Sequence, residues 1–284
     1  MGGYSNFHSH CTYCDGHSHP EDFVKSAVAR DFRAYGFSSH SPIPFETSWN
    51  MPKDLMMSYI TEINRLKRKY ADQLEIYLGL EIDFLDRTYN ASKDYFRNLP
   101  LDYRIGSVHF VKGLEPLSAN NMLCIDGRYR DFEYGVKQLF DGSVRRITEV
   151  FFGASLEMVE KGGFDIVGHI DKIYMNGSKY PGFDREADWF QKPFLALLDL
   201  IAEKGLIVEI NCKNWLSRNQ MFPHITTLPE LQKRKIPVMV NSDCHFPELV
   251  NDGREETLAL LKDAGFRVTR ELVDGRWGEV VISE

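Results

Sequence analysis

The stretch ADWFQKPFLALLDLIAEKGLIVEIN, residues 187–211, holds a helical pattern that is followed at once by a strand pattern. Gly205 ends the helical part, because a glycine just past the last turn is a common helix stop. The remainder, residues 206–211, is a short run rich in apolar and β-branched residues, which favours a buried strand. A helix that leads directly back into a strand is the repeating unit of parallel α/β folds.

The same alternation recurs along the chain. Parallel strands joined by right-handed crossovers form either an open sheet or a closed barrel, and the number of units here favours the barrel. The sequence therefore predicts one α/β domain over residues 1–284. The predicted strands are residues 4–8, 34–39, 75–82, 102–110, 164–170, 206–211 and 236–242, and predicted helices include residues 20–32, 51–73, 187–205 and 253–265.

The bulk composition excludes several classes of protein. The net charge of −7 over 284 residues repels polyanions, so a nucleic-acid partner is not expected. A small anionic substrate remains compatible, since bound metal cations set the local charge. The chain has no apolar run of about 18 residues, so no membrane span is predicted. The first ten residues lack the pattern of a signal peptide, and a cytoplasmic protein is expected.

The cysteines predict reduced thiols rather than a disulfide framework. Their number, five, is odd, and most of them fall in polar segments. Cys11-x-x-Cys14 has the spacing of half a zinc ribbon or of a redox motif, but the sequence has no second CxxC and no thioredoxin-like context. Packing is the expected role of these thiols, and also of Cys212 and Cys244.

Most of the nine histidines fall at, or just past, the predicted carboxyl ends of strands. One histidine beside an apolar run is usually a satisfied core residue, but the whole set is hard to explain in that way. The carboxyl ends of barrel strands open onto one face, where active sites form. His19 and His224 lie outside this pattern. The histidines that follow it are His8, His10, His17, His40, His109, His169 and His245.

These residues have the chemistry of a metal site. Side chains at positions i and i+2 of a strand share a face, so His8 and His10 can bind one ion, and Asp243 and His245 repeat the spacing. Imidazoles with a few carboxylates suit Zn, Mn or Fe rather than Ca or Mg. These candidate ligands are too many for one ion and fit two or three ions. The two oxygens of Glu81 are suited to bridging such ions.

The motifs taken together resemble the polymerase and histidinol phosphatase (PHP) superfamily, and within it the monofunctional histidinol-phosphatase branch. The resemblance runs from His8 to about His245. It implies a distorted (β/α)7 TIM-like barrel with a trinuclear metal site at the carboxyl ends of its strands. The motifs are the HxH near the N-terminus, SSHSP (38–42), GLEIDF (79–84), IGSVHF (105–110), VGHID (167–171) and NSDCH (241–245).

The resemblance also implies a set of ligands for each ion. Members of the family supply either an Asp just before a glycine of the first loop or a His just after it, and CDGH offers both Asp15 and His17. We favour His17, with Asp15 as its partner or substitute. The implied ligands are His8, His10, Glu81 and Asp243 for the first ion, Glu81, His109 and His169 for the second, and His17, His40 and His245 for the third.

The activity implied is hydrolysis of a phosphate monoester, most simply L-histidinol phosphate in histidine biosynthesis. A water activated between metal ions would attack phosphorus, and the expected catalytic residues are Glu81, Asp243 and His245. Lys172 and Arg218 are the expected phosphate contacts. Glu46, Trp49 and Trp215 are candidates, from loop position only, for the organic end of the substrate.

Three alternatives stay open at this point. The chain could hydrolyse another small phosphate ester or a nucleotide on the same site. It could be a PHP module that has no activity and supports a polymerase, although no expected ligand is missing and the chain is too short to contain one. It could also be a metal-binding protein without catalysis. As an enzyme, it is expected to act on a small molecule as a monomer or homodimer.

Overall fold

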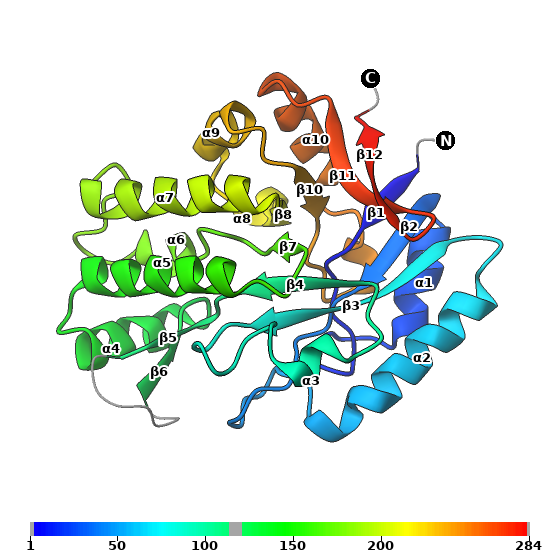
Figure 1. Cartoon of the computed structure of the whole chain (residues 1–284), viewed down its shortest axis with the longest axis horizontal. Helices are drawn as coiled ribbons and strands as arrows, with labels where there is room; N and C mark the ends of the chain where they lie inside the picture. Colours follow the sequence, from blue (N-terminus) through cyan, green and yellow to red (C-terminus); the bar gives the residue numbers. More distant parts are fainter. Residues whose placement is uncertain (1–2, 114–120, 283–284) are drawn as a thin grey trace.

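The computed structural model of the chain describes residues 3–113 and 121–282. Its main sheet has the strand order β1-β2-β3-β4-β7-β8-β10, and β9 pairs with β8 at the side (Figure 1). The path strands pair in parallel. They are β1 (Tyr4–Asn6), β2 (Phe32–Phe37), β3 (Glu75–Asp83), β4 (Tyr103–Ser107), β7 (Ile166–Val167), β8 (Ile207–Asn214) and β10 (Val238–Asn241), while β9 (Gln220–Phe222) is antiparallel.

Each strand on this path overlaps a strand that the sequence predicts. The sheet curls until its first and last strands meet, where Ser9 and Cys244 form a parallel bridge and His10 N donates to Cys244 O at 2.9 Å. The predicted α/β architecture, a distorted barrel of parallel strands, is confirmed.

Helices cover the outside of the barrel (Figure 1). Gly205 has a left-handed φ of 64° and ends α7 as predicted, and the helix continues through Pro193. The sequence analysis missed α4 and α5. No described helix is long and apolar enough to cross a membrane. The helices are α1 (Pro20–Val28), α2 (Met56–Lys69), α3 (Asp94–Arg97), α4 (Tyr129–Leu139), α5 (Val144–Lys161), α6 (Tyr174–Gly177), α7 (Asp188–Lys204), α8 (Trp215–Arg218), α9 (Leu228–Lys233) and α10 (Arg254–Asp263), with 3-10 turns η1 (Lys53–Leu55), η3 (Ile225–Thr227) and η4 (Pro247–Leu249).

The apolar core has two layers, one between helices and sheet and one inside the barrel. Tyr103 fills the barrel interior, and its hydroxyl donates to Phe7 O at 2.7 Å. Gly36 and Gly79 make room for this ring, because a Cβ on either would lie 2.4 Å from a Tyr103 atom. The glycines inside these two strands therefore have a packing reason.

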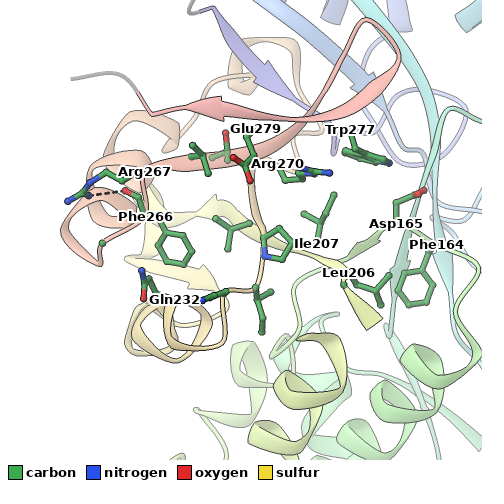
Figure 2. A pocket seen from close by; sticks show the side chains of 18 residues that line it. Phe164, Asp165, Leu206, Ile207, Gln232, Phe266, Arg267, Arg270, Trp277 and Glu279 are labelled. Carbon is green, nitrogen blue, oxygen red and sulfur yellow. Dashed lines mark hydrogen bonds between the residues drawn. The ribbon is translucent and has the colours of Figure 1, made fainter. Parts of the chain in front are cut away.

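A hairpin of β11 (Val268–Val273) and β12 (Arg276–Val281) covers the end of the barrel at which the strands start. Leu272 belongs to the interior apolar layer, and Trp277 packs against that layer. Figure 2 shows a pocket beside the hairpin, with Ile207 and Phe266 among its apolar lining residues. Its volume is about 610 Å³. A second hairpin, β5 (Phe110–Lys112) with β6 (Met122–Cys124), follows β4.

Candidate metal centre

Potential ligand atoms converge at the carboxyl ends of the barrel strands. His169 Nε2 lies 2.9 Å from Glu81 Oε1 and 3.1 Å from His109 Nε2. In addition, potential ligand atoms lie within 4.8 Å of one another in three groups. These groups are His10 with Asp15, His40 and His245; His8 with His10 and Asp243; and His40 with Glu81 and His109.

Strand geometry explains why these side chains meet. Along β8, Val208 and Ile210 face the helices, whereas Ile207 belongs to the interior layer and Glu209 lies on the same side. The inner face thus changes from apolar residues at the strand starts to polar residues at the strand ends. Ligand candidates at the far end also have strained backbones, since His169 has φ 23° and Asp243 has φ 46°. Such strain in residues other than glycine is concentrated at functional sites.

Glu81 lies at the centre of the cluster and is 1% exposed. Its Oε2 lies 3.2 Å from His8 Nε2 and 2.9 Å from His40 Nδ1. Its Oε1 lies 2.9 Å from His169 Nε2 and accepts a hydrogen bond from Ser107 Oγ at 2.7 Å. Two oxygens that each face several imidazoles are the arrangement expected of a carboxylate shared between metal ions.

The donor set fits divalent transition metals. Several buried atoms that face the cluster lack a hydrogen-bond partner, which is rare for buried polar atoms in folded proteins. Ligand nitrogens or oxygens at about 2.0–2.2 Å from one ion stand roughly 3 Å apart, as several atoms do here. The atoms without a partner are His8 Nε2, His10 Nε2, Asp15 Oδ1, His40 Nδ1 and Glu81 Oε2.

Electrostatics within the cluster favour bound positive charge. Burial alone would raise the pKa of Glu81, but His8 and His109 outweigh it and hold that pKa well below its usual range. Burial likewise opposes ionisation of Asp243, yet Lys213 and His8 keep its pKa well below normal. Burial would lower the pKa of His109, but Glu81 and another carboxylate raise it to about 10. The carboxylates stay ionised and attract cations.

Two of these imidazoles also contact a buried carboxylate through their Nδ1 atom. Nδ1 of His8 lies 2.5 Å from Glu209 Oε1, and Nδ1 of His109 lies 2.8 Å from Asp83 Oδ1. Such carboxylate partners orient metal-binding histidines. The sequence analysis missed both acids, although an acidic residue inside a buried apolar run, as in LIVEIN and GLEID, was a usable signal.

The cysteines are free thiols, as expected. Cys11 is fully buried in the outer core, which agrees with a packing role. Cys14 packs against the same core, and its Sγ also lies 3.5 Å from His10 Nδ1. The CxxC segment therefore lies against the metal centre through one of its thiols.

The structure places Asp15, and not His17, in the cluster. Asp15 Oδ2 lies 3.2 Å from His245 Nε2, whereas the exposed ring of His17 stacks on Phe246 with 4.2 Å between ring centroids. The turn explains the difference. Gly16 packs so closely on Cys11 that a Cβ would lie 2.3 Å from the Cys11 nitrogen, and this turn directs Asp15 inward. On this geometry Asp15, rather than His17, lies where it could share an ion with His10, His40 and His245.

A cavity of about 210 Å³ opens over the cluster. Lys172 and Trp49, two of the expected substrate contacts, line it, whereas Glu46 and Trp215 are not among its lining residues. Lys213, which the sequence analysis missed, also lines it, and its Nζ lies 3.1 Å from Asp243 Oδ1. Its position two residues after Asn211 on β8 was the available signal. The lining residues are Asp15, His40, Trp49, His109, Cys124, Asp126, Gly127, Lys172, Lys213, Asp243 and His245.

Arg218 does not line this cavity. It is exposed and lies on a neighbouring cavity, which shares Asp126 and Gly127 with the one over the cluster. The expectation that Arg218 contacts the substrate phosphate beside the metal ions therefore lacks support from its position. Lys172 and Lys213 are the cations that reach the cavity over the cluster.

Known proteins share both the sequence pattern and the fold. The "Probable histidinol-phosphatase" of Deinococcus radiodurans is 26% identical over 279 residues, which are 94% of this chain and 96% of that protein. The histidinol-phosphatase of Bacillus subtilis is 25% identical over 84% of this chain and 92% of its own length. The structure of histidinol phosphate phosphatase from Lactococcus lactis, complexed with Zn, L-histidinol and phosphate, has a TM-score of 0.74 at 19% identity and covers 96% of this chain and 98% of its own.

The model of the PHP domain family matches residues 6–213, which run from the last residue of β1 into β8 and leave out β10. The match contains most of the converging residues described above, from His8 to His169. Asp243 and His245, which lie beyond it, join the same cluster in the fold. The chain belongs to the PHP domain family.

Proposed function

We propose that this protein is a metal-dependent phosphatase that hydrolyses L-histidinol phosphate in the cytoplasm, acting as a single domain over residues 1–284. The observation that carries the proposal is the convergence of buried imidazoles and carboxylates, several of whose atoms lack a partner, below a cavity lined by two lysines. The relatives named histidinol-phosphatase, which match over most of the chain, support the substrate.

The proposed ions are two or three divalent Zn, Mn or Fe ions. When bound, they supply an activated water nucleophile and neutralise charge on the phosphoryl oxygens. Asp15 replaces His17 in the third set of ligands, because it is the residue that lies among His10, His40 and His245. The proposed ligands are His8, His10, Glu81 and Asp243 for the first ion, Glu81, His109 and His169 for the second, and Asp15, His40 and His245 for the third.

The side chains around the cavity bind and orient the ester. Lys172 and Lys213 hold the negative phosphate by charge-assisted hydrogen bonds. A water oxygen forms a bond to phosphorus, and the bond between phosphorus and the ester oxygen breaks. The electron pair stays on the ester oxygen, which leaves as the alcohol with a proton that the attacking water gives up and that His245 passes on at the cavity wall. Inorganic phosphate is the second product.

The organic end of the substrate extends toward the aromatic and acidic wall of the cavity. Trp49 lines this wall and packs edge-on against His40, with 4.5 Å between ring centroids. Asp126 also lines the cavity, and its Oδ2 lies 3.7 Å from Lys172 Nζ. An indole face and a carboxylate suit an imidazole ring that carries an ammonium group nearby.

Metal analysis of the purified protein, followed by phosphate release from a panel of esters, tests the proposal. We expect at least two divalent ions per chain and faster release from L-histidinol phosphate than from mononucleotides or simple alkyl phosphates. His8→Ala and His109→Ala should abolish release. Preference for another ester would identify a different phosphatase, while bound metal without turnover of any ester would identify a metal-binding protein without catalysis.

A further inference from the structure

Glu209 lies inside the barrel one layer below the metal centre, is fully buried, and takes no part in the proposed reaction. Each of its oxygens accepts two hydrogen bonds. Oε1 accepts from His8 Nδ1 at 2.5 Å and from Asn241 Nδ2 at 3.0 Å. Oε2 accepts from the backbone N of His169 at 3.1 Å and from Asn211 Nδ2 at 3.2 Å. A carboxylate has about four acceptor positions, so all of them are used.

The bond to His8 fixes which nitrogen of that ring carries hydrogen. An ionised carboxylate only accepts, so His8 Nδ1 donates, and when the ring is neutral the lone pair lies on Nε2, which faces Glu81 Oε2 at 3.2 Å. This Nε2 is one of the buried atoms without a protein partner. Glu209 therefore holds His8 in the tautomer and orientation that binding a metal requires.

The bond to His169 acts on the backbone instead. His169 has a positive φ of 23°, a conformation that residues with a Cβ rarely adopt. Its amide N–H points to Glu209, while its imidazole Nε2 lies 2.9 Å from Glu81 Oε1. The same carboxylate thus supports the side chain of one candidate ligand and the strained backbone of another.

We propose that Glu209 is a positioning residue that fixes His8 and His169 together and so couples the affinities of two metal ions. The inference rests on the proposed function in taking these histidines as ligands of two different ions. It adds that the two ions are held through one shared acceptor located beneath them. Disturbing that acceptor should weaken both ions together, although Glu209 contacts neither.

Glu209→Gln tests this proposal with little change of shape. Whichever way the amide turns, its NH₂ group replaces one oxygen and meets two donors. We expect metal to leave the purified protein at lower chelator concentration, as for binding about 10–100-fold weaker, which is the usual cost of losing a residue that orients metal ligands. Two ions should be lost together. Equal metal retention in the wild type and this variant overturns the proposal.

Glu271→Gln is a matched control. Glu271 is also a buried strand carboxylate, 2% exposed, but it bonds Arg33 and Arg254 rather than candidate ligands. This control should lower the melting temperature without lowering metal retention. If both variants lose metal in proportion to their loss of stability, Glu209 acts through stability alone and the proposal fails.

Asn241→Ala, which also removes the Oδ1 that accepts from Phe7 N at 2.8 Å, provides a second variant in case Glu209→Gln does not fold. It removes one donor from Oε1, the oxygen that holds His8, and should weaken the ion bound by His8 more than the ion bound by His169. Unchanged metal retention in folded Asn241→Ala would also overturn the proposal. A wild-type protein that holds no metal would instead contradict the proposed function, so the two failures are distinguishable.

Discussion

The barrel buries charge at both ends, and the two ends treat it differently. Where the strands start, Glu271 lies between Arg33 at 2.8 Å and Arg254 at 3.3 Å, and it also accepts from Thr269 Oγ1 at 2.7 Å. Where the strands end, Glu81 faces imidazoles, and its Oε2 has no hydrogen-bond partner. At the first end, guanidinium groups of the chain balance the charge of the acid. At the second end, several acceptor atoms converge on the same positions, where metal ions could bind.

This difference separates a structural charge cluster from a functional one. A carboxylate enclosed by cations of its own chain contributes to folding, and removing one partner leaves buried charge uncompensated. At the metal centre, several buried acceptor atoms have no hydrogen-bond donor among the described residues, so cations from solution are needed to satisfy them. Mutations at the first end should therefore change stability, and mutations at the second should change metal content and turnover.

Glu81→Gln should have the largest effect at the metal end. It removes the charge shared by the proposed ions, so we expect turnover to fall by more than the roughly 100-fold limit seen for residues that only orient ligands. Phosphate release and metal content per chain measure this. A variant that retains full metal content and turnover would show that Glu81 is not a shared ligand.

Glu271→Gln should have the largest effect at the opposite end. Breaking a buried pair by removing one partner costs about 3–5 kcal/mol of unfolding free energy, because Arg254 loses its acid and Arg33 keeps only Glu75, at 3.5 Å. Denaturant unfolding measures this loss, while metal content should stay unchanged. A loss of metal equal to that of Glu209→Gln would erase the distinction between the two ends.

The same carboxylate predicts a pH dependence. Burial would raise the pKa of Glu271, but Arg254 outweighs burial and lowers it below its value in the unfolded chain, near ~4.3. A lowered folded-state pKa gives stability that is present above the unfolded value and is lost as pH falls through the folded value. The difference in stability between wild type and Glu271→Gln should thus be greatest near neutral pH and shrink below about pH 4.

Asp15→Asn, compared with His17→Gln, tests which side chain of the first loop binds the third ion. Asp15 lies among His10, His40 and His245, whereas His17 stacks on an exposed phenylalanine. We expect Asp15→Asn to lose one bound ion and part of its turnover, and His17→Gln to keep both. The reverse result would restore His17 as the ligand.

Lys213→Gln should have the smallest effect of this series. A hydrogen bond to a charged group is worth about 1.5–3 kcal/mol, and the partial exposure of Lys213 reduces that value, so we expect kcat/KM to fall roughly tenfold. Arg218→Gln serves as the control and should leave kcat/KM unchanged, because its side chain lies on the neighbouring cavity. A larger loss at Arg218 would show that the substrate extends there.

The barrel itself could be predicted because its strands are short apolar runs with polar ends. The β11–β12 hairpin was missed although Asp274-Gly275, both with positive φ, is a typical hairpin turn between alternating residues. Helices α4 and α5 were also missed, although both are amphipathic. These omissions lie outside the regular alternation on which the prediction depended.

The candidate site could be predicted only in part. The histidines at strand ends could be predicted as candidate ligands, because parallel strands bring their carboxyl ends together. The choice between Asp15 and His17 depends on how Gly16 packs against Cys11, which is a tertiary contact. The partnership of Glu209 with His8 likewise joins residues far apart in the chain, and nothing in the local sequence specifies it.

The closure of the barrel gives the proposed ions a mechanical role. In the described part of the chain, the Ser9–Cys244 bridge joins the first strand to the last one of the ring in place of a continuous ladder. His10 and Asp243 flank this seam, and their facing atoms lie 3.1 Å apart. An ion bound by both residues would link the first strand to the last one and stabilise the seam. Removing the ion with a chelator should therefore speed amide exchange in β1 before it does so in the outer helices.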